Sequence, residues 1–235
     1  MGLDLPCAGT EPRAEISGFV LAGGRSSRLG RDKVLLPWNP QNGQTLLDHA
    51  VGRLRQVCGT VKVCADRDDL PHSMPLIQDA FPGAGPLGGM VAALEQSQTE
   101  WNLFLAVDLP LVPVEFLQAL VARVPAACAA CILPQVEGLP QPLCGLYRQL
   151  LAPGLRLALQ EGKYKVMHAV REAIKLLGPL APQPEMLDVT DRTGMGRLVL
   201  EGQARDWFLN INTAADWEQA QLLAPQMAPQ SRNKH

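Results

Sequence analysis

The stretch Ile16-Ser-Gly-Phe-Val-Leu-Ala-Gly-Gly-Arg-Ser-Ser-Arg-Leu-Gly-Arg-Asp-Lys33 joins an apolar run to a loop rich in glycine and positive charge. The run 16–21 predicts a buried strand. The loop that follows has four cations opposed only by Asp32, a net charge of +3. Backbone N–H groups of such a loop can close on phosphate oxygens, whose charge the arginines and Lys33 would neutralise. The alternative is an ordinary turn with solvated arginines.

Outward from this stretch, apolar runs alternate with amphipathic segments. Further strands are predicted at 61–65, 74–78, 101–107, 129–133, 143–147 and 208–211. Helices are predicted at 45–57, 86–96, 114–124, 150–160, 166–177 and 214–223, the last capped by Thr213. Continuous apolar strands between amphipathic helices indicate an α/β fold, with a mostly parallel twisted sheet and helices on both faces.

The domain organisation follows from the same pattern. We expect one domain over 16–224, preceded by an N-terminal extension at 1–15. Residues 181–205, rich in proline, glycine and charge, are expected to form an irregular insertion, and the polar tail 225–235 to be disordered.

Composition excludes several classes of protein. The chain has 235 residues and a net charge of −2, which gives no case for nucleic-acid binding beyond a local phosphate site. No run reaches the roughly eighteen apolar residues of a membrane span. The charged residues within 1–15 do not resemble a secretory signal, so a cytoplasmic location, away from any membrane, is the default expectation.

Three groups of polar residues follow predicted strands. The cationic loop follows the first strand, Asp79 follows 74–78, and Asp108 follows 101–107. Because ligands of such sheets bind beyond the carboxyl ends of the strands, we expect one crevice with a cationic side and a carboxylate side.

Each of these positions has a functional and a structural interpretation. Asp108 can hold Mg²⁺, which prefers oxygen ligands, or can be a common turn aspartate. The glycine-rich segment 79–89 can form a floor for a base or ribose, with Asp79 as acceptor, or a flexible connection. Lys33 suits a phosphate whose charge grows during reaction. The amides of Asn210 and Asn212 can face a ligand or belong to a helix cap.

Four segments together resemble the molybdenum cofactor guanylyltransferases, the MobA-type enzymes of molybdopterin guanine dinucleotide synthesis. They are Leu21-Ala-Gly-Gly-x-Ser-x-Arg-x-Gly-x-Asp-Lys33, Pro82-Gly-Ala-Gly-Pro-Leu-Gly-Gly-Met90, Val107-Asp-Leu-Pro-Leu-Val-Pro113 and Phe208-Leu-Asn-Ile-Asn-Thr213. The first motif is shared with a wider nucleotidyltransferase superfamily, and the four together are more specific. The resemblance covers about 16–180 and 206–224.

The resemblance implies a Rossmann-like, GT-A-like nucleotidyltransferase fold and Mg²⁺-dependent transfer of GMP from GTP to molybdenum-bound molybdopterin, with release of pyrophosphate. It implies catalytic roles for Lys33, Arg28 and Asp108, with Asp108 as the metal ligand. Carried over by position, the residues that contact GTP are Leu21, Ala22, Gly23, Gly24, Lys33, Asp79 and Asp108. Asn210 and Asn212 would lie toward the pterin. Partners would be the molybdenum cofactor insertion proteins and molybdoenzymes that take the product.

The sequence departs from the family pattern at two positions. Leu29 stands where Met is usual, and Cys64 stands where some members have an Asn that contacts the nucleotide, a role that Asp66 could take over.

Three alternative functions remain. The first is a molybdopterin cytidylyltransferase, whose motifs tend toward Ala-Ala-Gly and Gly-Pro-Ala. The other two are a sugar-phosphate nucleotidyltransferase and a nucleotide-binding regulator without turnover. The segments 22–24 and 85–87 favour guanine, and the presence of Lys33 and Asp108 favours an enzyme.

Overall fold

A computed structural model describes residues 15–23, 32–39, 41–67, 70, 75–79, 81–190 and 204–224. Within them, eight strands form one sheet in the order β10-β7-β9-β6-β1-β4-β5, with β8 paired to β7. Their bounds are β1 Ile16–Leu21, β4 Thr60–Ala65, β5 Leu76–Gln78, β6 Trp101–Ala106, β7 Cys131–Val136, β8 Leu139–Pro140, β9 Cys144–Arg148 and β10 Glu185–Asp188. A separate two-stranded hairpin joins β2 (Pro37–Asn39) to β3 (Gln44–Thr45).

The sheet is mostly parallel, as the sequence predicts. β1 lies between β4 and β6 and is parallel to both, whereas β9 runs antiparallel between β6 and β7. β1 and β6 are buried along their whole length, in keeping with continuous apolar runs that are covered on both faces.

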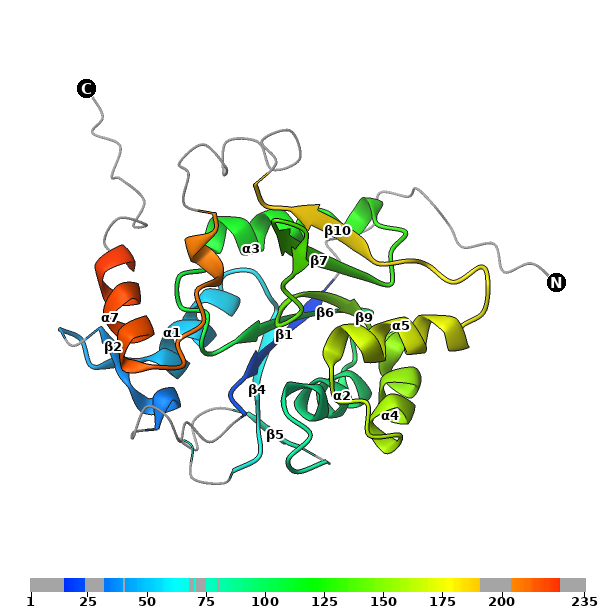
Figure 1. Ribbon diagram of the computed structural model, residues 1–235, viewed down its shortest axis with the longest axis horizontal. Helices are drawn as coiled ribbons and strands as arrows, with labels where there is room; N and C mark the ends of the chain where they lie inside the picture. Colours follow the sequence, from blue (N-terminus) through cyan, green and yellow to red (C-terminus); the bar gives the residue numbers. More distant parts are fainter. Residues whose placement is uncertain are drawn as a thin grey trace.

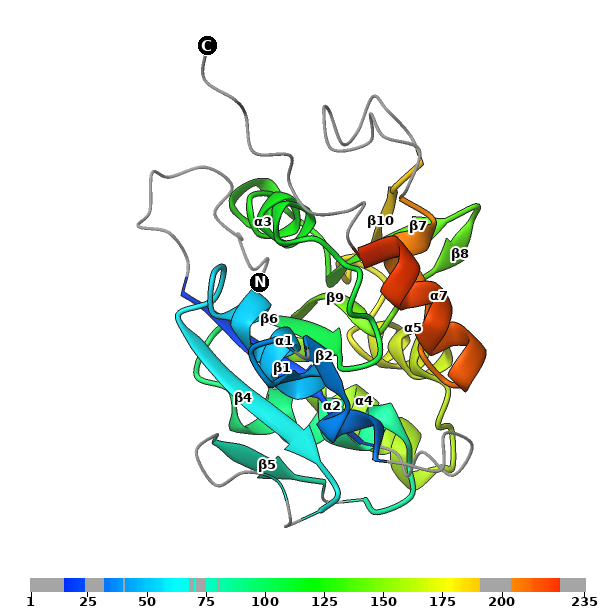
Figure 2. The same cartoon turned by 90° about the vertical axis from the view of Figure 1, so that its left-hand side faces the viewer.

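Helices cover both faces of this sheet (Figure 1, Figure 2). Their bounds are α1 Leu46–Leu54, α2 Pro86–Gln96, α3 Val114–Val121, α4 Ala152–Gln160, α5 Val166–Leu176 and α7 Ala214–Leu223. Side chains alternate along β1, so Gly18 faces Leu54 of α1 while Leu21 faces Gly89 of α2 on the opposite side. The stacked rings of Phe19 and Phe104, 5.3 Å apart, belong to the core between the sheet and its helices.

Two expectations about elements are wrong, and one hairpin was not predicted. No strand forms at 208–211: a 3₁₀ helix spans Asp206–Phe208, and the chain then turns to the end of β6, where Ile211 N–H donates to Asp108 O (3.0 Å). Part of the expected irregular segment 181–205 is β10, which pairs with β7. The β2–β3 hairpin is too short for hydrophobic periodicity to reveal.

Two further predictions concern the ends of the chain and membrane-spanning helices. The extension at 1–14 and the tail at 225–235 lie outside the described residues, so the domain bounds stay predictions. None of the helices in the described part of the chain is long and apolar enough to cross a bilayer.

Candidate active site

The end of β1 is fixed by its two parallel neighbours. Ala22 N–H donates to Cys64 O on the β4 side (2.9 Å), and Val107 N–H donates to Leu21 O on the β6 side (3.0 Å). Leu21 and Ala22 are buried. The first described residues of the predicted phosphate loop therefore leave the sheet between β4 and β6, where the sequence places the crevice.

Lys33 and Asp108 meet across this crevice. Lys33 Nζ lies 2.7 Å from Asp108 Oδ2, and the Lys33 side chain is only 11% exposed. Lys33 begins a 3₁₀ helix, Lys33–Leu35, whose N-cap is Asp32: the Asp32 carboxylate accepts a hydrogen bond from Val34 N–H (3.2 Å). The sequence predicts both residues at one site, and the structure brings them into direct contact.

The two oxygens of Asp108 have different surroundings. Oδ2 is paired with Lys33, while Oδ1 is the one buried side-chain N or O atom without a hydrogen-bond partner in the described part of the chain. A buried polar atom without a partner is uncommon and points to a missing ligand. No group of three or more His, Cys, Asp or Glu that could hold a metal occurs among the described residues. A single carboxylate fits Mg²⁺, which protein sites often bind through one or two carboxylates plus substrate phosphates.

The segment 210–212 lies beside the Lys33–Asp108 ion pair. Asn212 Oδ1 and Ile211 O each lie 3.4 Å from Lys33 Nζ and accept from it. Asn210 is exposed, and its side-chain amide donates to Phe208 O in its own segment (3.5 Å). Thr213 and Asp216 form a capping box at the start of α7, so the cap is made by Thr213 rather than by either asparagine. The structure thus brings Asn212, but not Asn210, to Lys33.

Asp79 lies over the first turn of α2. Its Oδ1 accepts from Phe81 N–H (2.8 Å), and a Cβ placed on Gly88 would meet both carboxylate oxygens at 2.3 Å. Gly88 therefore admits the carboxylate to the helix start. Burial, and to a smaller extent the nearby charge of Asp66, raise the pKa of Asp79, while the Phe81 N–H lowers it.

A cavity of about 120 Å³ lies between Asp79 and Asp108, which both line it. The sequence predicts four of its lining residues, Leu21, Gly23, Asp79 and Asp108, while Asp66 is predicted only as a substitute contact. Pro86 belongs to the glycine-rich segment 79–89 that the sequence predicts as a floor, and Cys64 stands at a position where the resemblance implies a nucleotide contact in some members. Ala65 and Leu143 are lining residues that sequence reasoning did not assign to the site. The position of Asp66 directly after β4 gives the same strand-end signal as Asp79, whereas nothing in the sequence marks Leu143.

Two predicted site residues, Gly24 and Arg28, lie outside the described residues, and their roles stay predictions.

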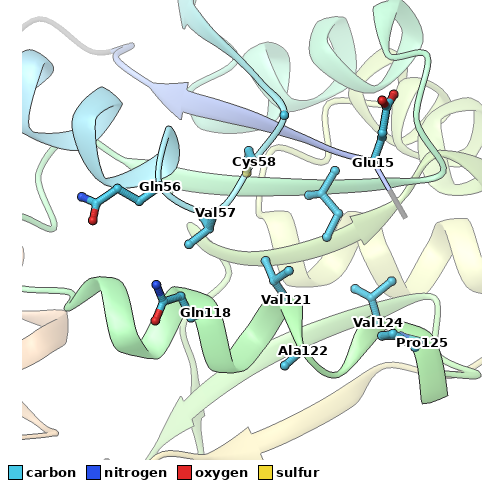
Figure 3. Close-up of a pocket in the computed structure, with 11 residues that line it drawn as sticks. Glu15, Gln56, Val57, Cys58, Gln118, Val121, Ala122, Val124 and Pro125 are labelled. Carbon is cyan, nitrogen blue, oxygen red and sulfur yellow. The ribbon is translucent and has the colours of Figure 1, made fainter. Parts of the chain in front are cut away.

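A larger cavity, of about 750 Å³, lies at the other end of β1 (Figure 3). It is bounded mainly by apolar residues of the α1–β4 connection and of α3 and its C-terminal extension, among them Val57, Cys58, Val121 and Val124. Its polar side chains are Glu15, Gln56 and Gln118, and it contains none of the strand-end residues described above. This cavity has the larger volume, but the carboxylates of Asp66, Asp79 and Asp108 line the smaller one, which we therefore take as the candidate active site.

Comparison with known proteins gives a consistent family assignment. A family model described as "MobA-like NTP transferase domain" matches residues 18–175. A probable molybdenum cofactor guanylyltransferase of Carboxydothermus hydrogenoformans is 30% identical over 200 residues, 85% of this chain and 91% of the relative. A relative with the same name in Synechococcus elongatus (strain PCC 7942) is 32% identical over 216 residues, 88% of this chain and 98% of the relative.

Solved structures show the same fold. The molybdopterin-guanine dinucleotide biosynthesis protein A of Archaeoglobus fulgidus superposes with a TM-score of 0.71 at 20% identity, covering 89% of this chain and 99% of the other. The 2-C-methyl-D-erythritol 4-phosphate cytidylyltransferase of Thermus thermophilus superposes with a TM-score of 0.58 at 18% identity, covering 90% and 99%. At these identities the likeness concerns the fold, which confirms the expected α/β nucleotidyltransferase architecture.

Proposed function

The chain belongs to the MobA-like NTP transferase family, a family of nucleotidyltransferases, and from this premise we propose that it transfers GMP from GTP to molybdenum-bound molybdopterin and releases pyrophosphate. The observation that carries the proposal is the contact between Lys33 and Asp108, 2.7 Å long, beside a carboxylate oxygen that has no partner among the described residues. A cation and a metal-ready carboxylate at one point suit transfer between phosphates, where charge must be neutralised.

Asp108 is the proposed Mg²⁺ ligand, through Oδ1. When bound there, Mg²⁺ would supply positive charge to the phosphate oxygens of the nucleotide. Lys33 is held beside Asp108 and donates at 3.4 Å to Ile211 O and Asn212 Oδ1, so its ammonium can turn one of these longer bonds toward a phosphate without leaving the site. The acceptor, a phosphate of the pterin, is ionised already and needs no general base. This agrees with a site whose described residues offer charge and position rather than a nucleophile.

Two carboxylates in the cavity support guanine as the base. Asp66 and Asp79 both line it, and each can accept two hydrogen bonds from the adjacent N1–H and N2–H₂ of guanine. The corresponding edge of cytosine carries the acceptors N3 and O2, which a carboxylate repels. The same chemistry disfavours the cytidylyltransferase alternative. The cytidylyltransferase among the solved structures shares the fold alone.

The remaining alternatives differ in what they require of the site. A regulator that binds a nucleotide without turnover has no need for an Asp108 Oδ1 that lacks a partner among the described residues. A sugar-phosphate nucleotidyltransferase would accept a sugar phosphate in place of the pterin. The proposed partners are GTP, molybdenum-bound molybdopterin, and the insertion proteins and molybdoenzymes that would receive the product.

The test is pyrophosphate release from each of the four nucleoside triphosphates, with molybdenum-bound molybdopterin or a sugar phosphate as acceptor and Mg²⁺ present. We expect release with GTP and the pterin to exceed release with the other combinations. A preference for CTP would overturn the guanine assignment, and release only with a sugar phosphate would overturn the acceptor.

A further inference from the structure

The turn that carries Asp108 is held from behind by side chains of α1. After Asp108 the chain runs through Leu109-Pro-Leu-Val-Pro113, and the carbonyls of Pro110 and Val112 meet two residues one helical turn apart. Arg53 Nη1 donates to Val112 O, and His49 Nε2 lies 2.9 Å from Pro110 O. Arg53 Nε also donates to His49 Nε2 (2.8 Å). One arginine therefore contacts both the turn and the imidazole beside it.

The Arg53 contact satisfies the Val112 carbonyl of this turn, whereas His49 Nε2, which accepts from Arg53 Nε, has no proton to donate to Pro110 O. Pro110 and Pro113 have no N–H, and the N–H groups of Leu109 and Val112 donate to Ala106 O and Leu109 O, so the buried Val112 carbonyl takes its donor from the Arg53 side chain. A buried carbonyl without a donor costs free energy. The guanidinium supplies a charge-assisted hydrogen bond, which is stronger than a neutral one and fixed in direction by the planar group.

The same helix also fixes the segment that carries Lys33. At its start, Leu46 N–H donates to Leu36 O (2.9 Å), three residues beyond Lys33. α1 therefore contacts the chain on both sides of the Lys33–Asp108 pair, near Lys33 through its backbone and near Asp108 through Arg53. The relative position of these two charged groups depends on one rigid element.

Burial affects the pKa values of Arg53 and His49, and ring packing restrains the His49 side chain. Burial lowers the pKa of Arg53 to about 10, although the charge of Glu115 acts in the opposite direction. Burial and the adjacent Arg53 cation lower the pKa of His49 to about 4, so the imidazole is neutral at pH 7. The His49 ring packs against Trp38, which packs in turn against Trp217 of α7. The His49 side chain cannot leave without exposing the Trp38 ring.

We propose that Arg53 is a positioning residue of the reaction, which fixes Asp108 for metal and phosphate by holding the Val112 carbonyl of its turn. The proposal rests on the function proposed above. Arg53 does not touch the reacting atoms; it acts through four residues of backbone. A purely structural role, in which Arg53 only stabilises the packing of α1, is the competing account.

The experiment compares Arg53→Met and Arg53→Lys with Arg55→Met, a control on the exposed end of the same helix. Loss of an outer-shell contact of this kind typically costs about 10- to 100-fold in activity or metal affinity. We expect Arg53→Met to lose kcat in that range with little change in KM for GTP. Arg53→Lys should recover part of the loss, because an ammonium can still donate to Val112 O. Arg55→Met should match the parent.

A second readout separates this proposal from the proposed function. Mn²⁺ binding in the presence of GTP, followed by electron paramagnetic resonance, should weaken in Arg53→Met by about tenfold or more, while thermal unfolding still shows a folded protein. Unchanged kcat and unchanged Mn²⁺ affinity, with only a lower Tm, would overturn the positioning role. If the parent transfers a nucleotide other than GMP, the proposed function fails, but the ratio of variant to parent still decides the role of Arg53.

Discussion

Asp108 has two unequal oxygens, and that inequality is the most informative feature at the scale of single residues. Oδ2 is neutralised by Lys33, while Oδ1 is buried without a partner among the described residues. Leaving a buried acceptor unpaired costs about 1–3 kcal/mol, more when it is charged. A bound cation would remove that cost, which is the physical basis for proposing Asp108 as a metal ligand.

Substitution of the pair tests these roles directly. We expect Lys33→Ala to lose about 2–4 kcal/mol of transition-state stabilisation, comparable to loss of one oxyanion donor. Asp108→Asn should abolish most turnover yet leave the fold intact, because the bonds Val107 N–Leu21 O and Ile211 N–Asp108 O belong to the backbone. The measurement is kcat with circular dichroism as the control for folding. Lys175→Ala removes an exposed lysine and should leave kcat unchanged. Turnover at the parental level in Lys33→Ala would place Lys33 outside the reaction.

Sequence reasoning predicted Asp79 and Asp108 because each directly follows a predicted strand, and Lys33 because it is the one lysine of the cationic loop. It could not identify the bond between Lys33 and Asn212, which lie 179 positions apart, nor separate the roles of Asn212 and Asn210. That separation depends on the turn at Ile211, which only the folded chain defines.

At the scale of elements, α2 packs against the sheet and also borders the cavity proposed to bind the nucleotide. Gly89 lies close to Cys64 and Leu21 of the sheet, with its would-be Cβ 3.2 Å from Cys64 Cβ, whereas Gly88 makes room for the Asp79 carboxylate. The N-cap is Gly85, with φ of +67°, followed by Pro86 at the first helical position. Glycine tolerates such a φ, and proline at N1 lacks only an N–H that would have no partner within the helix.

Gly88→Ala tests the link between this helix and the nucleotide. The added Cβ would displace the Asp79 carboxylate, which can rotate, so we expect the protein to fold while KM for GTP rises by roughly tenfold, or about 1.4 kcal/mol. Gly52→Ala is the matched control, because its Cβ would meet only Gln44 Nε2 at 3.9 Å. There we expect unchanged KM and a gain of about 0.5–1 kcal/mol in the free energy of unfolding. Equal KM values for both variants would contradict a role of Asp79 in binding.

Helices whose starts are marked by a turn or a capping residue were predicted with bounds that match the structure. The predicted helices 86–96 and 214–223 match α2 and α7, since Gly-Pro and Thr213 mark their starts. The run Phe208-Leu-Asn-Ile211 predicts a strand by composition, but a long-range bond to Asp108 O determines its conformation instead. β10 has four residues and pairs with β7, a tertiary contact that its own sequence does not indicate.

At the scale of the whole molecule, the order of strands places the site. From β1 the chain moves to β4 and β5 on one side, then crosses to β6 on the other, so β1 lies where the direction of strand addition reverses. Ligands of open α/β sheets bind at the carboxyl ends of strands beside such a point. Apolar runs predict the strands but not their order, and the antiparallel β9 gives no local signal of its direction.

We propose that GTP and a divalent metal bind in the crevice at the carboxyl ends of β1 and β6. The most direct measurement is a crystal structure of the protein with GTP and Mn²⁺, with the metal located by anomalous scattering. We predict Mn²⁺ beside Asp108 Oδ1, phosphates at Lys33 and the base between Asp66 and Asp79. A nucleotide seated instead in the larger cavity at the other end of β1, against Val57 and Val121, would contradict the account.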